Sequence, residues 1–365
     1  MPPTEKEAMA TAKTKLVVSD FHLGNGRFFP DGTVNPLEDF VYDRRFIEFL
    51  DHHHQEEGAG ELELIINGDF MNMIQLMPEE QEKGILTEQA AVDKTEAIVA
   101  GHRELFEALR RFNSGANRRI TYIMGNHDPG ILWPGVQDVL RRTIQGELVF
   151  VSESYQFDGV HIEHGHQMEP IFRFDSERYF LTRGFREPVL NLPWGVFFVK
   201  DFLYKVKQRR PYIDKVKPYN MYTRWAVFND FWFGLLTTLR YIFFCLRTRF
   251  SHLPLKRAQA LKGLSAFREL KRSPTLSDQA ERLLRREDAN IVIMGHTHIP
   301  IHRRFGAGRE YLNPGCWNGV TSLSLDSLGH TRQLLYVRID YQRGQPRARL
   351  LEWHGQPRLF EEVRV

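Results

Sequence analysis

The sequence predicts a layered α/β fold, and three observations support this prediction. Short apolar runs typical of strands alternate with longer amphipathic stretches typical of helices. Five of the apolar runs are followed by Asp, Asn or His. Sites in open α/β sheets form at the carboxyl ends of the strands, so these polar residues are expected to meet in one place.

The predicted elements follow one another along most of the chain. Residues 1–15 are polar and lack the apolar region of a signal peptide, so they are expected to form a loose tail. Helical spacing marks residues 39–54, and residues 87–112 are expected to form one long amphipathic helix with basic residues at its end. Strands are expected over residues 15–19, 62–66, 120–124, 160–163 and 291–294, and near 309–312, 320–325, 334–340 and 346–353.

Composition places few limits on function. A chain of 365 residues is long enough to bury a sizeable core. Its 49 basic and 46 acidic residues leave a net charge of +3, which indicates no particular partner. The two cysteines, Cys245 and Cys316, are far apart and are expected to be free thiols in a reducing compartment.

The segment 291–298, with the sequence IVIMGHTH, is the most informative stretch. His296 and His298 are two positions apart, so they project to the same side of an extended segment, where imidazoles suit metal binding. Alone, this pair is equally compatible with a structural role. The strand ends together supply Asp20, His22, Asp69, Asn126, His127, Asp128, His164, His296 and His298.

This set of oxygen and nitrogen ligands suits borderline divalent metals such as Mn, Fe, Zn or Co. Asp69 is central in the order and could bridge two ions. Two ions about 3.5–4 Å apart form a clamp for displacement at phosphorus. The alternative interpretation is that Asp20 and Asp69 are helix N-caps and that Asn126 is a turn residue.

Five motifs in this set resemble those of the calcineurin-like metallophosphoesterases. They occur in the family's order, each after a predicted strand: DxH at Asp20–His22, GD at Gly68–Asp69, GNHD at Gly125–Asp128, HG at His164–Gly165 and GHTH at Gly295–His298. The resemblance covers residues 13–168 and 288–353. It implies a four-layer α/β/β/α sandwich and a metal-dependent hydrolase in which a metal-bridging hydroxide attacks phosphorus.

The resemblance also implies a role for each residue. Asp20, His22 and His298 would hold one metal ion, and Asn126, His164 and His296 a second. Asp69 would bridge the two ions, which are expected to be Mn, with Fe, Zn, Co or Ni as alternatives. His127 resembles the catalytic histidine, and Asp128 would orient it. Asn72 stands where the family often has a second aspartate.

Residues 169–287 interrupt the catalytic domain, which is expected to span 13–168 and 288–365. The insertion is expected to be helical, basic and rich in aromatic residues. Its first part could grip a phosphate or form a charged helix face, through Arg173, Asp175, Arg178, Tyr179 and Arg183.

An apolar stripe at helical spacing follows in the insertion, and it includes Trp225, Phe228, Trp232, Leu236 and Phe243. Polar interruptions make a transmembrane span a poor fit. The stripe fits a helix at a membrane interface, a lid packed on the core, or a dimer surface.

Within the family, the arrangement is similar to the UDP-2,3-diacylglucosamine hydrolase-like enzymes of lipid A biosynthesis. Residues 174–183, FDSERYFLTR, resemble a stretch of their lid. His127 stands where those enzymes have arginine, and HGHQ replaces their HGD. The resemblance implies a lipid-linked nucleotide diphosphate substrate. With the apolar and basic insertion, the protein is expected to be cytoplasmic and peripheral on the inner face of the membrane.

Two other functions remain open from the sequence. One is a soluble phosphatase or phosphodiesterase for small esters, with the insertion as the arm of a homodimer. The other is a non-catalytic scaffold. No nucleic-acid partner is expected, because a continuous apolar stripe is unlike the dispersed basic and aromatic residues of a nucleic-acid groove.

Overall fold

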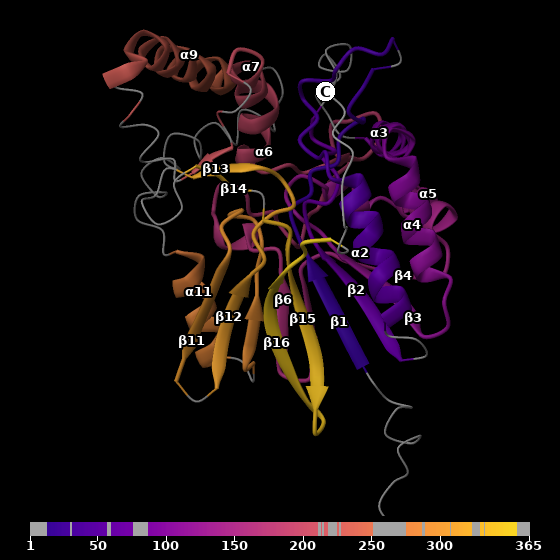
Figure 1. Ribbon diagram of the computed structural model, residues 1–365. Helices are drawn as coiled ribbons and strands as arrows, with labels where there is room; N and C mark the ends of the chain where they lie inside the picture. Colours follow the sequence, from indigo (N-terminus) through magenta and orange to yellow (C-terminus); the bar gives the residue numbers. More distant parts are fainter. Residues whose placement is uncertain are drawn as a thin grey trace, which may run out of the picture.

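Two β-sheets packed face to face form the centre of the protein (Figure 1). The structure is a computed structural model. It describes residues 13–29, 31–56, 60–75, 87–210, 213, 215–217, 225, 228–250, 275–286, 289–306, 308–322, 329–331 and 333–355.

The first sheet has six strands. In order across the sheet they are β16 (Gln345–Glu352), β15 (Leu335–Gln342), β1 (Lys13–Val18), β2 (Glu61–Asn67), β3 (Arg118–Ile123) and β4 (Glu147–Val151). Strands β1 to β4 are parallel, with Leu16 beside Leu64 and Leu64 beside Ile120. Its outer face is covered by α2 (Asp43–Glu56), α3 (Glu88–Gly101), α4 (Arg103–Asn113) and α5 (Pro134–Ile144). The carboxyl ends of β1, β2 and β3 therefore meet at one edge.

The second sheet has five strands. In order they are β11 (Ile301–Phe305), β12 (Arg309–Asn313), β10 (Ile291–Ile293), β6 (Val160–Glu163) and β5 (Ser154–Phe157). Strand β10 is parallel to both β12 and β6. Helix α11 (Leu276–Arg286) packs on the outer face against β10 and β12.

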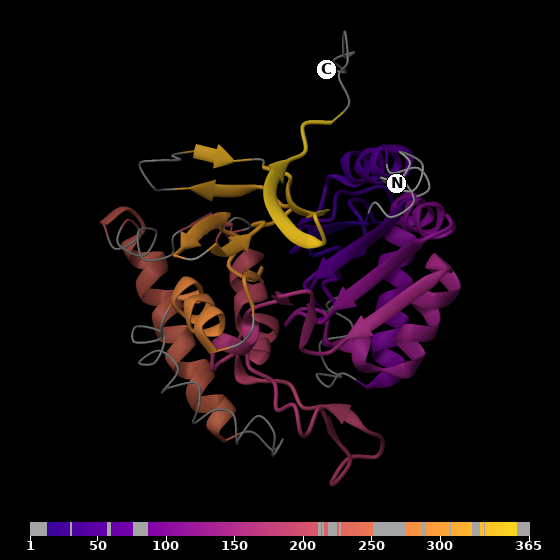
Figure 2. The same cartoon turned by 90° about the horizontal axis from the view of Figure 1, so that it is seen from below.

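Successive side chains of a strand point to opposite faces of its sheet, so each central strand packs against the layers on both sides. On β1, Leu16 and Val18 face the helices, whereas Val17 faces the second sheet. Val17 packs there with Ile65 of β2 and Ile293 of β10. Seen from below, the helices lie outside the two sheets (Figure 2). The predicted four-layer α/β/β/α sandwich is confirmed.

The insertion contains β7 (Phe180–Leu181), β8 (Val189–Leu190), α6 (Trp194–Phe198), the π-helical turn η4 (Val199–Leu203), α7 (Tyr204–Lys207), β9 (Val216–Lys217) and α9 (Phe231–Arg249). Its helices α6, α7 and α9 lie beyond one end of the sheets (Figure 1), whereas α11, at the end of the expected insertion, packs on the second sheet as part of the catalytic core. Strand β9 pairs with β13 (Val320–Ser322), which pairs with β14 (Gly329–Thr331). Lys207 of α7 forms an ion pair with Asp39, 3.0 Å apart, so α7 is tied to the catalytic core.

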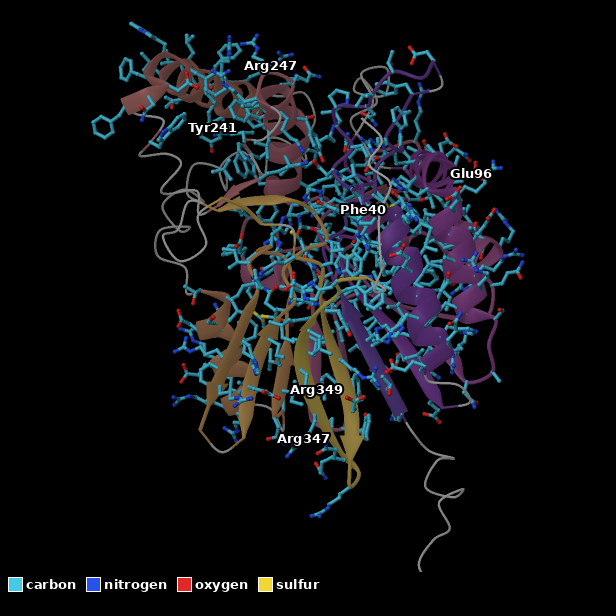
Figure 3. The ribbon with its side chains drawn as sticks, in the orientation of Figure 1. Phe40, Glu96, Tyr241, Arg247, Arg347 and Arg349 are labelled. Atoms are coloured by element: carbon cyan, nitrogen blue, oxygen red, sulfur yellow. The ribbon has the colours of Figure 1, made fainter. Side chains whose placement is uncertain are left out.

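Helix α9 contacts α6 and η4 through one side only. Tyr241 packs on Phe198 and Phe202, and the Phe244 ring packs on Phe202. Arg247 of α9 is exposed (Figure 3). None of the described helices is both long and apolar enough to cross a membrane.

The expected long helix over residues 87–112 is wrong, because it is two helices that meet at His102. Gly101, the last residue of α3, lies against the backbone of Asn25 and Gly26. A Cβ atom at Gly101 would lie 2.4 Å from the carbonyl carbon and oxygen of Asn25. This close approach places the loop after His22 against the helix junction. Several strands were also not predicted, namely β4, β5, β7, β8, β9, β11 and β14.

His102 connects this junction to the loop that follows β1. Its Nδ1 lies 2.6 Å from Oδ1 of Asp43, and its Nε2 lies 3.5 Å from Oε2 of Glu38. Glu38 in turn accepts hydrogen bonds from the backbone N–H groups of Gly24 and Gly26. Burial lowers the pKa of His102, but the two carboxylates outweigh burial and raise it to about 9.

We predict that this cluster makes stability depend on pH. Because the pKa of His102 is higher in the folded state, its stabilisation is complete below about pH 6.5 and is lost as the pH rises through about 9. The shift corresponds to roughly 3 kcal/mol of unfolding free energy. Urea unfolding between pH 6 and 10 tests this. His102→Gln should flatten the decline, and an unchanged slope in that variant would contradict the assignment.

Candidate metal centre

The polar residues that follow five strands converge at one end of the two sheets. Asp20 and His22 follow β1, Asp69 follows β2, Asn126 to Asp128 follow β3, His164 follows β6, and His296 and His298 follow β10. Backbone hydrogen bonds join these loops: Asp20 N–H donates to Gly68 O, and His22 N–H donates to Asp69 O. The loops after β1 and β2 are therefore held together by their own main chains.

Strained backbone is concentrated in this cluster. Five of its residues have positive φ angles, an uncommon conformation without glycine: Asp20 (59°), His22 (56°), Asp69 (52°), His296 (68°) and His298 (61°). Each such residue costs on the order of 1 kcal/mol. Strain of this kind persists where the surroundings hold it, and it turns these side chains toward a common point.

The first group of candidate ligands is Asp20, His22 and His298. The Nε2 atoms of the two imidazoles lie 3.0 Å apart. Oδ1 of Asp20 lies 3.2 Å from Nε2 of His298 and 3.9 Å from Nε2 of His22. The other oxygen of Asp20 accepts from the backbone N–H of His296, at 3.0 Å, so Oδ1 is the oxygen that faces the imidazoles.

The second group is Asp69, His164 and His296. Oδ2 of Asp69 lies 3.3 Å from Nε2 of His164 and 3.8 Å from Nε2 of His22 in the first group. Oδ1 of Asp69 accepts from the backbone N–H of His127, at 2.7 Å. One oxygen of Asp69 therefore fixes the β3 loop, and the other lies between the two groups.

The donor set fits divalent metal ions. Within the described residues, Asp20 Oδ1, Asn126 Oδ1 and His164 Nε2 are buried polar atoms with no hydrogen-bond partner. Nδ1 of His164 donates to the carbonyl oxygen of Asn67, at 2.8 Å, so in the neutral imidazole Nε2 is the nitrogen with the lone pair that a metal ion requires. Buried polar atoms without partners are costly, and a bound cation is the partner that all three accept.

The electrostatics favour a bound cation as well. Burial raises the pKa of both carboxyl groups, but neighbouring imidazoles, first of all His164, hold the pKa of Asp20 at about 2 and that of Asp69 well below its usual range. Burial lowers the pKa of His22 to about 4, which favours the neutral form that binds metals. Burial also lowers the pKa of His164, but the negative potential of Asp69 and Asp20 raises it to about 9.

His127 lies at the edge of both groups. Its ring is 4.5 Å from the His22 ring, and its Nδ1 lies 3.2 Å from Oδ1 of Asn72. The expectation that Asp128 orients His127 is not met. Asp128 instead accepts hydrogen bonds from the Tyr122 hydroxyl and from the backbone N–H groups of Phe70 and Gly125. Both of its oxygens brace the turn after β3, and Asn72 takes the position beside His127.

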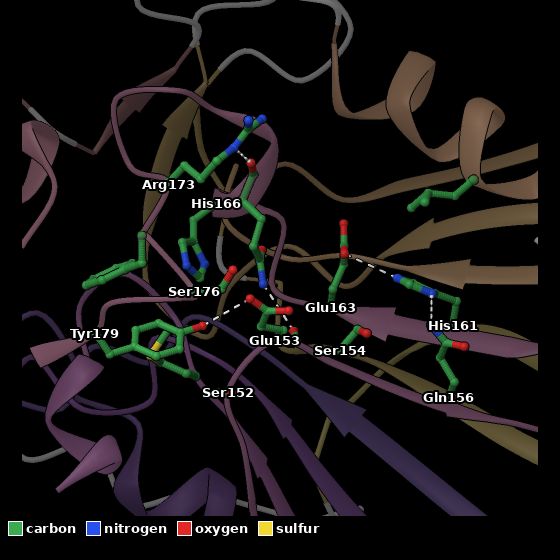
Figure 4. Close-up of a pocket in the computed structure, with 14 residues that line it drawn as sticks. Ser152, Glu153, Ser154, Gln156, His161, Glu163, His166, Arg173, Ser176 and Tyr179 are labelled. Atoms are coloured by element: carbon green, nitrogen blue, oxygen red, sulfur yellow. Dashed lines mark hydrogen bonds and ion pairs between the residues drawn. The ribbon is translucent and has the colours of Figure 1, made fainter. Parts of the chain in front are cut away.

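The five expected substrate residues do not gather in one place. Arg173 and Tyr179 line a cavity of about 280 Å³ beside the cluster, whereas Asp175, Arg178 and Arg183 are exposed and do not line it. Tyr179 donates to Glu153, at 3.1 Å, and Arg173 donates to the carbonyl oxygen of Gln167, at 2.6 Å (Figure 4).

The cavity has both polar and apolar lining and lies next to the second group. His166 is fully buried there, and its ring centroid is 5.4 Å from that of His164. His161 and Glu163 of β6 line the far side, with Nε2 and Oε2 3.2 Å apart (Figure 4).

The expected membrane or lid residues are largely exposed. The exposed fractions are 51% for Trp225, 86% for Phe228, 72% for Trp232, 48% for Leu236 and 64% for Phe243. These values show that the stripe is not covered by the described part of the catalytic core.

Three residues near the cluster were not predicted as parts of the site. Glu169 lies 3.4 Å from Nε2 of His296, and Phe172 packs on the same imidazole. Tyr204 donates a hydrogen bond to Asn72 from 132 positions away. In the sequence, the only indication for Glu169 and Phe172 is that they closely follow the HGH motif. No sequence feature indicates Tyr204.

The fold and the two ligand groups define a metal-dependent hydrolase. A family model described as calcineurin-like phosphoesterase matches residues 14–300. The chain belongs to this family. The family implies divalent metal ions and a phosphate-ester substrate.

Solved structures show only distant likeness. A predicted phosphoesterase from Streptococcus pneumoniae is 13% identical, with 95% of this chain and 94% of that one covered and a TM-score of 0.29. Vps29 from Entamoeba histolytica, as a single mutant, is 13% identical, with coverages of 93% and 99% and a TM-score of 0.27. A dimetal phosphatase from Danio rerio is 8% identical, with coverages of 93% and 99% and a TM-score of 0.35. Likeness at this level assigns no activity to this chain, and no curated protein matches it.

Proposed function

We propose that the protein is a phosphoesterase with two metal ions. The observation that carries this proposal is the position of Asp69 Oδ2 between the two ligand groups. Asp20, His22 and His298 would hold one ion, with Asn126, His164 and His296 holding the other and Asp69 shared between them. When bound, two such ions polarise a phosphoryl group and activate water for in-line attack. The ligand types suit Mn, Fe, Zn, Co or Ni, and Mn is the ion we would load first.

The protein's own residues would hold the phosphate and move a proton. The side-chain oxygen of Asn72 is hydrogen-bonded to Nδ1 of His127, so Nε2 is the ring nitrogen that can face a substrate. A protonated Nε2 beside the leaving oxygen would protonate that oxygen as the P–O bond breaks. The backbone N–H of His127 is bonded to Asp69, which fixes the imidazole relative to the ligand groups.

The bridging assignment predicts the metal content of an Asp69 variant. Asp69→Asn should lose both ions, because the amide removes the shared negative charge. Elemental analysis of manganese-loaded, dialysed protein measures the ions per chain. Asp138→Asn, on the exposed face of α5, is the matched control and should retain two ions. Two ions retained by Asp69→Asn would contradict the bridging role.

The role of His127 predicts loss of turnover without loss of metal. His127→Ala should lower kcat by roughly 10²–10⁴. His127 also lies close enough to His22 and Asp69 to be considered as a ligand. Elemental analysis separates the two roles, because a full complement of ions in the inactive variant supports proton transfer. A variant that loses an ion would reassign His127 to the metal centre.

We further propose that the substrate is a lipid-linked nucleotide diphosphate cleaved at a membrane surface. The exposed side of α9 supports this proposal. Its apolar side chains are Phe231, Trp232, Leu235, Leu236, Leu239, Ile242, Phe243 and Leu246, each at least 39% exposed. Arg240, Arg247 and Arg249 are exposed on the same helix. Such a helix suits an interface that offers acyl chains and anionic headgroups.

The attachment of α9 fits the same proposal. Cys245 is buried, and Tyr241 and Phe244 pack on the α6–η4 helix, so one side of α9 is anchored. Burying a large apolar side chain in lipid contributes about 1.5–3 kcal/mol. The exposed residues of α9 thus offer a surface for a bilayer, while its anchored side connects to α7 over the catalytic core.

A substrate panel tests the lipid proposal. Manganese-loaded protein is assayed on UDP-2,3-diacylglucosamine in mixed micelles, on bis-p-nitrophenyl phosphate and on p-nitrophenyl phosphate. We expect release of UMP from the lipid. The double variant Trp232→Ser, Phe243→Ser should lose at least about ten-fold on the lipid and bind liposomes less, while its turnover of the small diester changes by less than about two-fold.

The control variant is Val34→Ser, which removes a side chain that is 62% exposed outside the insertion. It should leave all rates unchanged. Turnover of the small diester with no cleavage of the lipid would support a soluble phosphodiesterase instead. No turnover of any of the three substrates, with both ions bound, would support a non-catalytic scaffold.

A further inference from the structure

We propose that Tyr204, in the insertion, is a positioning residue for His127 and acts through Asn72. This inference rests on the proposed function, in which His127 protonates the leaving group. The hydroxyl of Tyr204 donates to Oδ1 of Asn72, at 2.9 Å. The same oxygen lies 3.2 Å from Nδ1 of His127. Tyr204 and His127 therefore share one acceptor atom.

The orientation of the Asn72 amide follows from its other contacts. The carbonyl oxygen of Leu37 can only accept, so the Gln75 group facing it, at 3.1 Å, is Nε2. Oε1 of Gln75 then faces Nδ2 of Asn72, at 3.0 Å. This leaves Oδ1 of Asn72 for Tyr204 and His127. Because an amide oxygen cannot donate, Nδ1 of His127 must carry a proton.

Burial makes the loss of either of these hydrogen bonds costly. Asn72 is 1% exposed and Tyr204 6%, so water does not readily replace a lost contact. A neutral amide holds an imidazole less strongly than a carboxylate does. The Tyr204 hydroxyl occupies the second lone pair of the amide oxygen and opposes rotation of the amide. A rotated amide would present its N–H₂ group to the Nδ1–H of His127 and disfavour the doubly protonated imidazolium, the form that can give up a proton from Nε2.

Tyr204 is itself held in place. Its ring packs with the main hydrophobic core, and Lys207, one turn later on α7, pairs with Asp39 at 3.0 Å. Lys215 of the insertion also lies 3.0 Å from Asp39. The beginning of the insertion is thus fixed where the Tyr204 hydroxyl meets Asn72. Through Tyr204, the insertion therefore helps to position the proton donor His127.

The test is the dependence of rate on the leaving group. Tyr204→Phe keeps the ring and removes only the hydroxyl. We expect kcat for diphenyl phosphate, whose basic phenolate needs a proton, to fall about ten-fold or more. Turnover of bis-p-nitrophenyl phosphate, whose leaving group is weakly basic, should change by less than about two-fold, with KM and metal content unchanged. Equal losses on both substrates, or no loss, would overturn the proposal.

Two comparisons separate this inference from the proposed function. Tyr204→Phe in an Asn72→Leu background should cause no further loss, because the path through Asn72 is already broken. An additive further loss would overturn the path. Tyr241→Phe, an insertion tyrosine that packs on Phe198 and Phe202, should leave the leaving-group dependence unchanged. If His127→Ala has full activity on both substrates, the role of His127 fails, and the inference about Tyr204 fails with it.

Discussion

The carboxylate of Asp69 is the group around which the site is built. Its Oδ1 fixes the main chain after β3, and its Oδ2 lies between the imidazoles of His22 and His164. The glycine of GNHD makes room for it, and the glycine of GD makes room for its neighbour His164. A Cβ atom at Gly125 would lie 2.1 Å from Oδ1 of Asp69, and one at Gly68 would lie 2.5 Å from Nδ1 of His164. The glycines of GD and GNHD are therefore packing requirements of the site, and the polar residues beside them are its candidate ligands.

Much of the fold was predictable because buried strands leave a clear pattern. An apolar run followed within a few residues by Asp, Asn or His marked β1, β2, β3, β6 and β10, and these five strands position all of the candidate ligands. Strands without such an ending were missed. β4 has one buried residue, Leu148, and β5 has none, while β11 contains His302, Arg303 and Arg304 on a largely exposed strand. Their pairing is set by neighbours distant in sequence.

The contacts around the ligands were less predictable than the ligands. Asp128 follows His127 directly, yet the turn after β3 points its carboxylate toward Tyr122 and the backbone. Asn72 is three positions after Asp69, directly after the isolated β-bridge between Leu23 and Met71, and it lies beside His127. The break at His102 depends on Gly101 meeting Asn25, a contact that no local pattern encodes. Periodicity predicts which residues are buried, but not which polar groups find one another.

The insertion connects an exposed surface to the proposed proton donor by a short path of packed residues. Tyr241 of α9 contacts Phe198 and Phe202, and Tyr204 follows Phe202 on the same helical segment. The π-helical turn η4 contains Phe202 and ends just before Tyr204, and such turns are frequent at functional sites. A ligand that shifts α9 would act on Tyr204 through aromatic contacts rather than through a flexible linker. The same insertion would thus bind the apolar part of a substrate and set the position of the group that protonates its leaving oxygen.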